Sequence, residues 1–159
     1  MSSTVTEPPA TAHRKIIQLY EYWRKKIPGP GLLPGRRDID PVDFGPLLPN
    51  VWLVDVVGEP PRFRFRLVGG AILKMGMPAK VGDFVDDFLQ STDKAQTMAE
   101  FEAAARERRP MWFRGPAKMP YETKMFELER IFLPLAGDGT RVDILLCMTV
   151  YYSLDGREI

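Results

Sequence analysis

The sequence predicts an α+β fold in which helices cover one face of a five-stranded antiparallel sheet. A strand-like hairpin follows a first amphipathic helix, helical segments occupy the middle of the chain, and three strand-like segments close it. Hairpins separated by helices are typical of α+β domains. The 159 residues fit one domain, and 45% hydrophobic with 27% charged residues suits a folded core.

The first predicted element is an amphipathic helix over residues 13–27. We expect the polar leader of residues 1–12 to be disordered. Residues 28–50 are rich in Pro and Gly and predict a connector. Within it, Asp40 and Pro41 are typical of a cap before a short helical turn. The apolar positions of the helix recur at helical spacing: Ile16, Leu19, Tyr20, Trp23 and Ile27.

The next two segments predict a hairpin. Residues 51–57 are an apolar run, a Gly-Glu-Pro-Pro turn follows, and arginine then alternates with apolar residues over 62–68. Successive side chains of a strand point to opposite faces, so Phe63, Phe65 and Leu67 should form one row and the arginines the other. We expect the apolar row to face the covering helices, because burying unpaired arginines would be strongly unfavourable.

Helical segments follow the hairpin. Short helices are predicted near Ala71 and over residues 82–89, and a longer one runs from Ser91 or Thr92 to about Arg108. Pro110 ends this last helix.

The end of the chain predicts three strands, over residues 111–118, 123–135 and 141–152. A Gly-Asp-Gly turn joins the last two. The final strand is apolar on both faces in its middle, which indicates a central position in the sheet. The N-terminal helix is then available to cover the outer face.

Several motifs, in order along the chain, resemble the signature of the PAS domain, in particular a family of short, single-domain bacterial PAS proteins of alphaproteobacterial type. The motifs are Leu19-Tyr20-Glu21-Tyr22-Trp23, Arg37-Asp38-Ile39-Asp40-Pro41, Leu47-Leu48-Pro49-Asn50-Val51, Phe63-Arg64-Phe65-Arg66-Leu67-Val68-Gly69, and Phe132-Leu133-Pro134-Leu135 with Asp138-Gly139. The resemblance spans about residues 19–152. It implies a sheet with strands in the spatial order 2-1-5-4-3, and a sensory or protein-interaction role without a fixed cofactor. Where the familiar pattern continues Gly-Thr after the second strand, this chain has Gly69-Gly70-Ala71, so no threonine hydroxyl caps the next helix.

Reactive residues are too few to predict catalysis or a cofactor. One histidine, His13, and one cysteine, Cys147, cannot close a zinc site, and no core histidine is present to ligate haem. The Asn-Cys-Arg type motif of flavin-adduct photoreceptors is absent. We therefore expect no enzyme activity, haem, flavin or metal.

The charge and hydropathy pattern favours a cytoplasmic protein. The net charge of +1 gives no reason to expect nucleic acid or a membrane surface as a partner. The N-terminus is not of signal-peptide type, and no apolar run has the length of a membrane span.

Aromatic and methionine residues are abundant in the core-facing segments. They fill the core in the simpler interpretation, and in the alternative they line an adaptable apolar cavity between the sheet and the middle helices. The candidate ligand-pocket residues are Phe63, Phe65, Leu67, Leu73, Met77, Phe88, Met98, Phe132 and Ile144.

The expected function is that of a stand-alone PAS-like sensory or adaptor domain that acts by protein–protein association. In one interpretation a small apolar ligand gates this association, and in the other the domain is a ligand-free structural interaction module. The PAS-like core is expected over residues 51–152, followed by a tail of residues 153–159. No effector sequence follows Tyr152, so we expect output through a homodimer or an unknown signalling partner. The predicted dimer surface combines the exposed face of the last strands with the helix stripe of Ile16, Leu19, Tyr20, Trp23 and Ile27.

Overall fold

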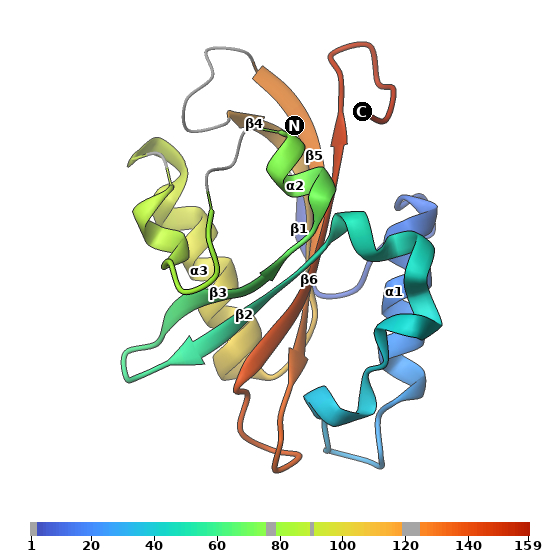
Figure 1. The fold of residues 1–159 in the computed structure, drawn as a ribbon, viewed down its shortest axis with the longest axis vertical. Coiled ribbons are helices and arrows are strands. Elements are labelled where there is room, and N and C mark those ends of the chain that lie inside the picture. Colours follow the sequence, from blue (N-terminus) through green and yellow to red (C-terminus); the bar gives the residue numbers. More distant parts are fainter. Residues whose placement is uncertain (1–2, 76–78, 90, 119–124) are drawn as a thin grey trace.

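One antiparallel sheet organises the fold (Figure 1). The computed structural model describes residues 3–75, 79–89, 91–118 and 125–159. Within these residues the strands run in the order β1-β4-β5-β6-β2-β3. The strands are β1 (Ser3–Val5), β2 (Val51–Val57), β3 (Arg62–Val68), β4 (Met111–Lys118), β5 (Met125–Leu135) and β6 (Ile144–Tyr152).

The predicted strand order is confirmed. The sequence of strands β3-β2-β6-β5-β4 is the order 2-1-5-4-3, with β6 central and every one of its residues buried. The sheet has one strand more than predicted, β1, which pairs with β4 so that Thr4 lies opposite Phe113. The prediction of a disordered leader is therefore wrong at Ser3–Val5. Without β1, β4 would be an edge strand with unpaired backbone groups, and pairing with these groups orders the segment.

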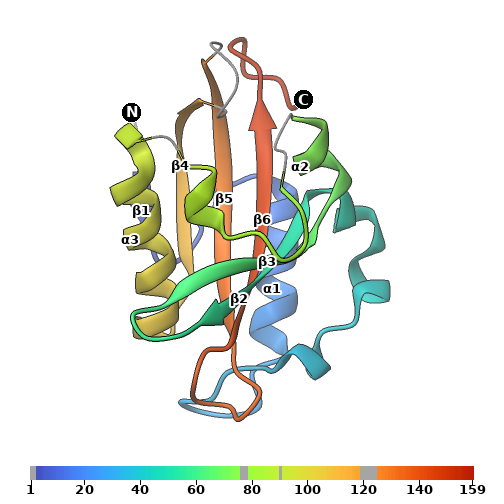
Figure 2. The same ribbon diagram turned by 60° about the vertical axis from the view of Figure 1, so that its left-hand side comes forward.

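Helices cover both faces of the sheet. The α-helix α3 lies on one face and α1 on the other (Figures 1 and 2). None of the helices in the described part of the chain has the length and apolar character needed to cross a bilayer. The helices are α1 (Arg14–Lys25), η1 (Arg36–Asp38), η2 (Pro41–Asn50), α2 (Gly70–Lys74), η3 (Val85–Asp87) and α3 (Ser91–Glu107).

Helix α1 packs its apolar stripe on the outer face of its own sheet, as predicted. Its N-cap is His13, whose Nδ1 accepts a hydrogen bond from the backbone N–H of Lys15 at 3.0 Å. The indole N–H of Trp23 donates to the backbone oxygen of Pro134 at 2.9 Å. Ile16, Leu19, Tyr20 and Trp23 are all buried in the single chain, and Ile27 is half-buried against the same core.

The stripe therefore cannot form the dimer surface that the sequence assigns to it. The predicted second part of that surface, the outer face of the last strands, is covered as well, since α1 contacts β5 and β6 and η2 contacts β6. The helical period indicated an apolar face, but it carried no information on whether the covering surface was a second chain or the chain's own sheet. A homodimer itself stays a prediction.

A β-bulge in β3 divides the predicted apolar row of that strand. Val54 lies opposite Phe65, but the preceding Leu53 lies opposite Leu67, so β3 has one extra residue at this point. An extra residue reverses the alternation of faces beyond it. Phe63 lies against Phe101 of α3 and Phe65 against Phe88, so both face the covering helices as predicted. The prediction for Leu67 is wrong, because this side chain lies on the outer face and is 37% exposed.

Candidate functional site

An aromatic cluster occupies the space between the sheet and α3. The rings of Phe101 on α3 and Phe132 on β5 stack with centroids 4.3 Å apart, and Phe63 lies 4.9 Å from Phe101. Trp52 lies within about 6 Å of Phe65, Phe101 and Phe132. All five side chains are buried, so rings fill this part of the interior.

The candidate pocket residues do not surround one space. Phe63, Phe65 and Phe132 belong to the aromatic cluster, and Phe88 and Met98 are half-buried beside the core. The other described candidates lie elsewhere: Leu67 and Ile144 on the outer face, and Leu73 46% exposed on α2. Met77 lies outside the described residues.

A buried ion pair borders the aromatic cluster. Arg130 on β5 donates to the carboxylate of Glu100 on α3, and its guanidinium lies 4.4 Å from the centre of the Phe113 ring. The Nε atom of Arg130 is buried and has no hydrogen-bond partner among the residues that the structure describes. Burial raises the pKa of the nearby Cys147 thiol well above its usual range, with Arg130 acting in the opposite direction, so this thiol stays protonated and unreactive at neutral pH.

A second buried charge lies on the outer face, beneath the start of α1. Glu129 is fully buried, and its Oε2 accepts hydrogen bonds from the backbone N–H of His13 and the indole N–H of Trp112, both at 2.9 Å. Its Oε1 accepts from the hydroxyl of Tyr152 at 2.8 Å, and Arg114 lies 3.8 Å away. Burial and the bond to Glu129 raise the pKa of Tyr152. This site joins α1 to three strands and has the character of a structural anchor.

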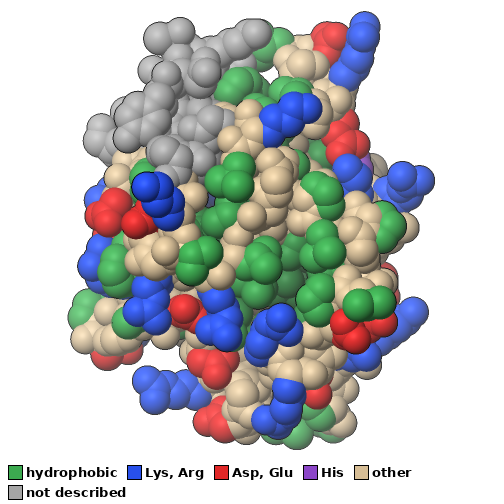
Figure 3. All heavy atoms as spheres, viewed as in Figure 1, with side chains coloured by type: hydrophobic (Ala, Val, Ile, Leu, Met, Phe, Trp, Pro, Cys, Tyr) green, Lys and Arg blue, Asp and Glu red, His purple; other side chains and the backbone are tan. Residues whose placement is uncertain are grey.

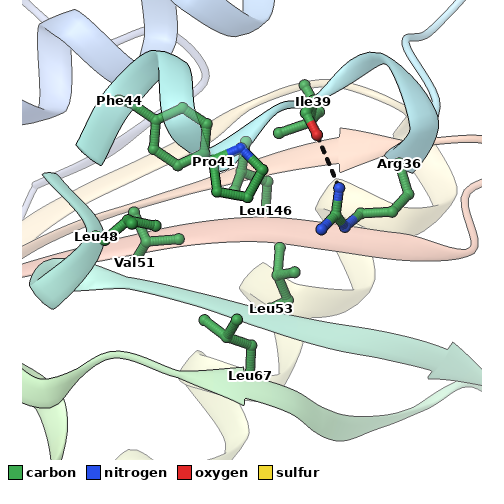
Figure 4. A pocket seen from close by; sticks show the side chains of 9 residues that line it. All are labelled: Arg36, Ile39, Pro41, Phe44, Leu48, Val51, Leu53, Leu67 and Leu146. Carbon is green, nitrogen blue, oxygen red and sulfur yellow. Dashed lines mark hydrogen bonds between the residues drawn. The ribbon is translucent and has the colours of Figure 1, made fainter.

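An open groove lies on the outer face between η1, η2 and the strands β2, β3 and β6. Figure 4 shows the side chains from the two 3-10 helices facing those from the sheet across it. The groove is lined by Arg36, Ile39, Pro41, Phe44, Leu48, Val51, Leu53, Leu67 and Leu146. Its free space is about 20 Å³, which is room for about one water molecule or the end of one side chain.

Arginines give one end of this groove a positive charge. The Nη1 of Arg36 donates to the backbone oxygen of Ile39 at 2.8 Å. The next outer-face position of β2 after Leu53 is Asp55, which accepts hydrogen bonds from Arg66 at 3.1 Å and Arg64 at 3.5 Å. Arg64 and Arg66 thus share one carboxylate at this end, and Arg36 adds a third guanidinium.

The sequence did not predict the groove, because residues 28–50 were interpreted only as a connector with a short helical turn. The available signal was the set of apolar residues inside this Pro- and Gly-rich segment, among them Ile39, Phe44 and Leu48. Glu129 and Arg130 were missed for another reason. They stand out as charges within an apolar strand, but their partners are far away in the sequence.

The strand order and the helices on the sheet define a PAS-type α+β module. In the described part of the chain no group of three or more His, Cys, Asp or Glu side chains could hold a metal ion. A family model for the PAS domain matches residues 11–149, nearly the whole chain. The chain therefore belongs to the PAS domain family, a class of sensory and signalling modules. No curated protein and no solved structure matches it.

Proposed function

We propose that this PAS domain is a sensory adaptor that acts by association with another protein, and that the outer-face groove is its contact surface. The observation that carries the proposal is the combination of an open apolar groove with exposed aliphatic residues at its border. Leu67 is 37% exposed and Val42, next to Pro41, is 84% exposed. Exposed apolar surface of this kind, rimmed by charge, is typical of interaction sites. The proposal includes no catalysis and neither nucleic acid nor a membrane as partner.

Crosslinking with mass spectrometry in the cell of origin tests this proposal. The full chain should capture a protein partner, and Leu67→Glu should lose it, because a charge then lies in the groove. Leu154→Glu is the matched control, since Leu154 is exposed on the C-terminal turn outside the groove. Loss of the partner in both variants, or in neither, would count against the groove.

A second candidate function is gating by a small ligand between the sheet and α3. It is supported by the half-buried Phe88 and Met98 beside the aromatic cluster and by the unpaired Nε of Arg130. An unpaired buried donor is uncommon and offers a point of contact to a bound molecule. Native mass spectrometry of the purified chain distinguishes the two functions: a retained small molecule favours gating, and its absence favours the ligand-free interaction module.

Two further parts of the proposal concern assembly and location. We expect a homodimer, which must use a surface other than the buried stripe of α1, and light scattering of the full chain measures it. We expect the protein in the cytoplasm, which imaging of a fluorescent fusion checks.

A further inference from the structure

The outer-face groove has the shape of a site for one aliphatic side chain. Val51, Leu53 and Leu146 form its buried floor, and Leu48 and Leu67 stand at its border. Its free space of about 20 Å³ and its aliphatic lining suit the end of a Leu, Ile or Val side chain. Burial of such a side chain away from water stabilises the complex.

The arginines at one end of the groove limit which charges of a partner can lie beside the inserted aliphatic side chain. Among the described residues no carboxylate lies within ion-pair distance of Arg36, whose bond to the oxygen of Ile39 uses only one of its N–H groups. Arg64 and Arg66 share the single carboxylate of Asp55. The arginine end of the groove therefore attracts negative charge and repels a basic segment.

The surface view agrees with this arrangement. Hydrophobic side chains gather in the middle of the face that carries β2, β3 and η2, and Lys and Arg side chains, with Asp and Glu among them, lie along the lower edge of this patch (Figure 3). An apolar centre with a charged rim is the usual organisation of a protein interface.

We propose that the groove binds an acidic segment of a different protein, which inserts one aliphatic side chain and places a neighbouring carboxylate against Arg36. This inference rests on the proposed adaptor function and specifies the chemistry of its partner. The carboxylate forms a charge-assisted hydrogen bond to the free N–H groups of Arg36. The aliphatic side chain supplies the apolar contact with Leu53 and Leu67.

A second copy of this chain fits the groove less well. Among the described residues, two exposed aliphatic side chains are followed by an aspartate, in Val42–Asp43 and Leu154–Asp155. Asp43 accepts a hydrogen bond from Tyr22 at 2.8 Å, and Asp155 forms an ion pair with Arg157 at 3.1 Å. Both carboxylates are thus already engaged within the chain.

Selection of a random-peptide phage library on the full chain tests the inference. The enriched peptides should contain a Leu, Ile or Val next to Asp or Glu. Fluorescence anisotropy with an enriched peptide should show binding weakened at least about tenfold by Arg36→Gln and by Leu67→Glu, and unchanged by Leu154→Glu. Added salt should weaken binding to the wild-type chain more than to Arg36→Gln, because Arg36→Gln removes the charge pair. Equal unfolding midpoints of the variants show that the fold is kept.

Several outcomes would overturn the inference. They are a library without binders, enriched peptides that are basic or uncharged, and binding that does not depend on Arg36. A wild-type dimer in light scattering that Leu67→Glu dissociates would assign the groove to a second copy instead. A cellular partner that depends on Leu67 but lacks an acidic aliphatic segment would overturn this inference and leave the adaptor function standing.

Discussion

At Gly69, where β3 ends and α2 begins, three backbone carbonyl oxygens lie where a β-carbon would point. They belong to Pro49, Leu48 and Val51, and all would be closer than 3.0 Å to such an atom. Only glycine allows this approach of α2 to η2. At the neighbouring Gly70 a β-carbon would meet no atom within 4 Å, so this position offers a matched control.

We expect Gly69→Ala to destabilise the fold by roughly 1–3 kcal/mol or more, because backbone atoms must move to admit the methyl group. Gly70→Ala should change stability by less than about 1 kcal/mol, and in the stabilising direction if anything, since alanine reduces the freedom of the unfolded chain. Urea unfolding of the two variants measures the difference. Equal stabilities would contradict the close approach.

The buried carboxylate of Glu129 has most of its hydrogen-bonding capacity filled by donors from other parts of the chain. Glu129→Gln replaces one acceptor oxygen by an amide donor that faces the N–H and O–H donors of His13, Trp112 and Tyr152. We expect a loss of about 2–4 kcal/mol in the free energy of unfolding. Glu127→Gln is the control, because Glu127 pairs with Arg114 at a partly exposed position and should cost less than about 1 kcal/mol.

At the scale of elements, the beginning of α1 depends on an unusual cap. The ring nitrogen of His13 accepts from the N–H of Lys15, and its other nitrogen lies 2.9 Å from Glu158 in the C-terminal segment. The cap therefore places the start of the helix, the sheet and the end of the described chain together.

His13→Ala should lower stability by about 1 kcal/mol, because it leaves an N–H at the start of the helix without its acceptor. His13→Asn should recover most of this loss, since Asn is a good N-cap but does not reach as far as the imidazole. Chemical unfolding followed by circular dichroism compares them. If the Asn variant is as unstable as the Ala variant, the contact with Glu158 rather than the cap is what matters.

For the molecule as a whole, the buried tyrosine hydroxyl and cysteine thiol groups predict how the free energy of unfolding depends on pH. Burial raises the pKa of Tyr151 far above its ordinary value, with Arg130 acting in the opposite direction, and burial also raises the pKa of Cys147. The folded chain then keeps protons that the unfolded chain releases. This contribution is complete below the ordinary pKa of each group and is lost as the pH rises above it.

Stability should therefore fall at alkaline pH, and Tyr151→Phe should reduce the slope above about pH 10 by up to about 1.4 kcal/mol per pH unit. The half-buried Tyr22 has a pKa that is raised by burial to a lesser extent, so Tyr22→Phe should reduce the slope less. Urea unfolding at a series of pH values gives the slopes. A slope that is the same in Tyr151→Phe and the wild-type chain would contradict the prediction.

The class of fold and most element bounds were predictable from local patterns in the sequence, and the strand order from its resemblance to the PAS domain. The strands β2 and β4 begin and end where alternation and turn residues predict, and α1 follows its helical period. These features depend on local patterns, which a sequence displays directly.

Which surfaces remain free depends on tertiary contacts that local patterns do not show. The face of Leu67 depends on a bulge that arises from pairing with β2, and the stripe of α1 is covered by the chain's own sheet. The groove forms because the connector folds back over strands that follow it in the sequence, and Glu129 meets the start of α1 across 116 positions. A periodic pattern shows that a face is apolar, but what covers that face is a property of contacts between residues distant in the chain.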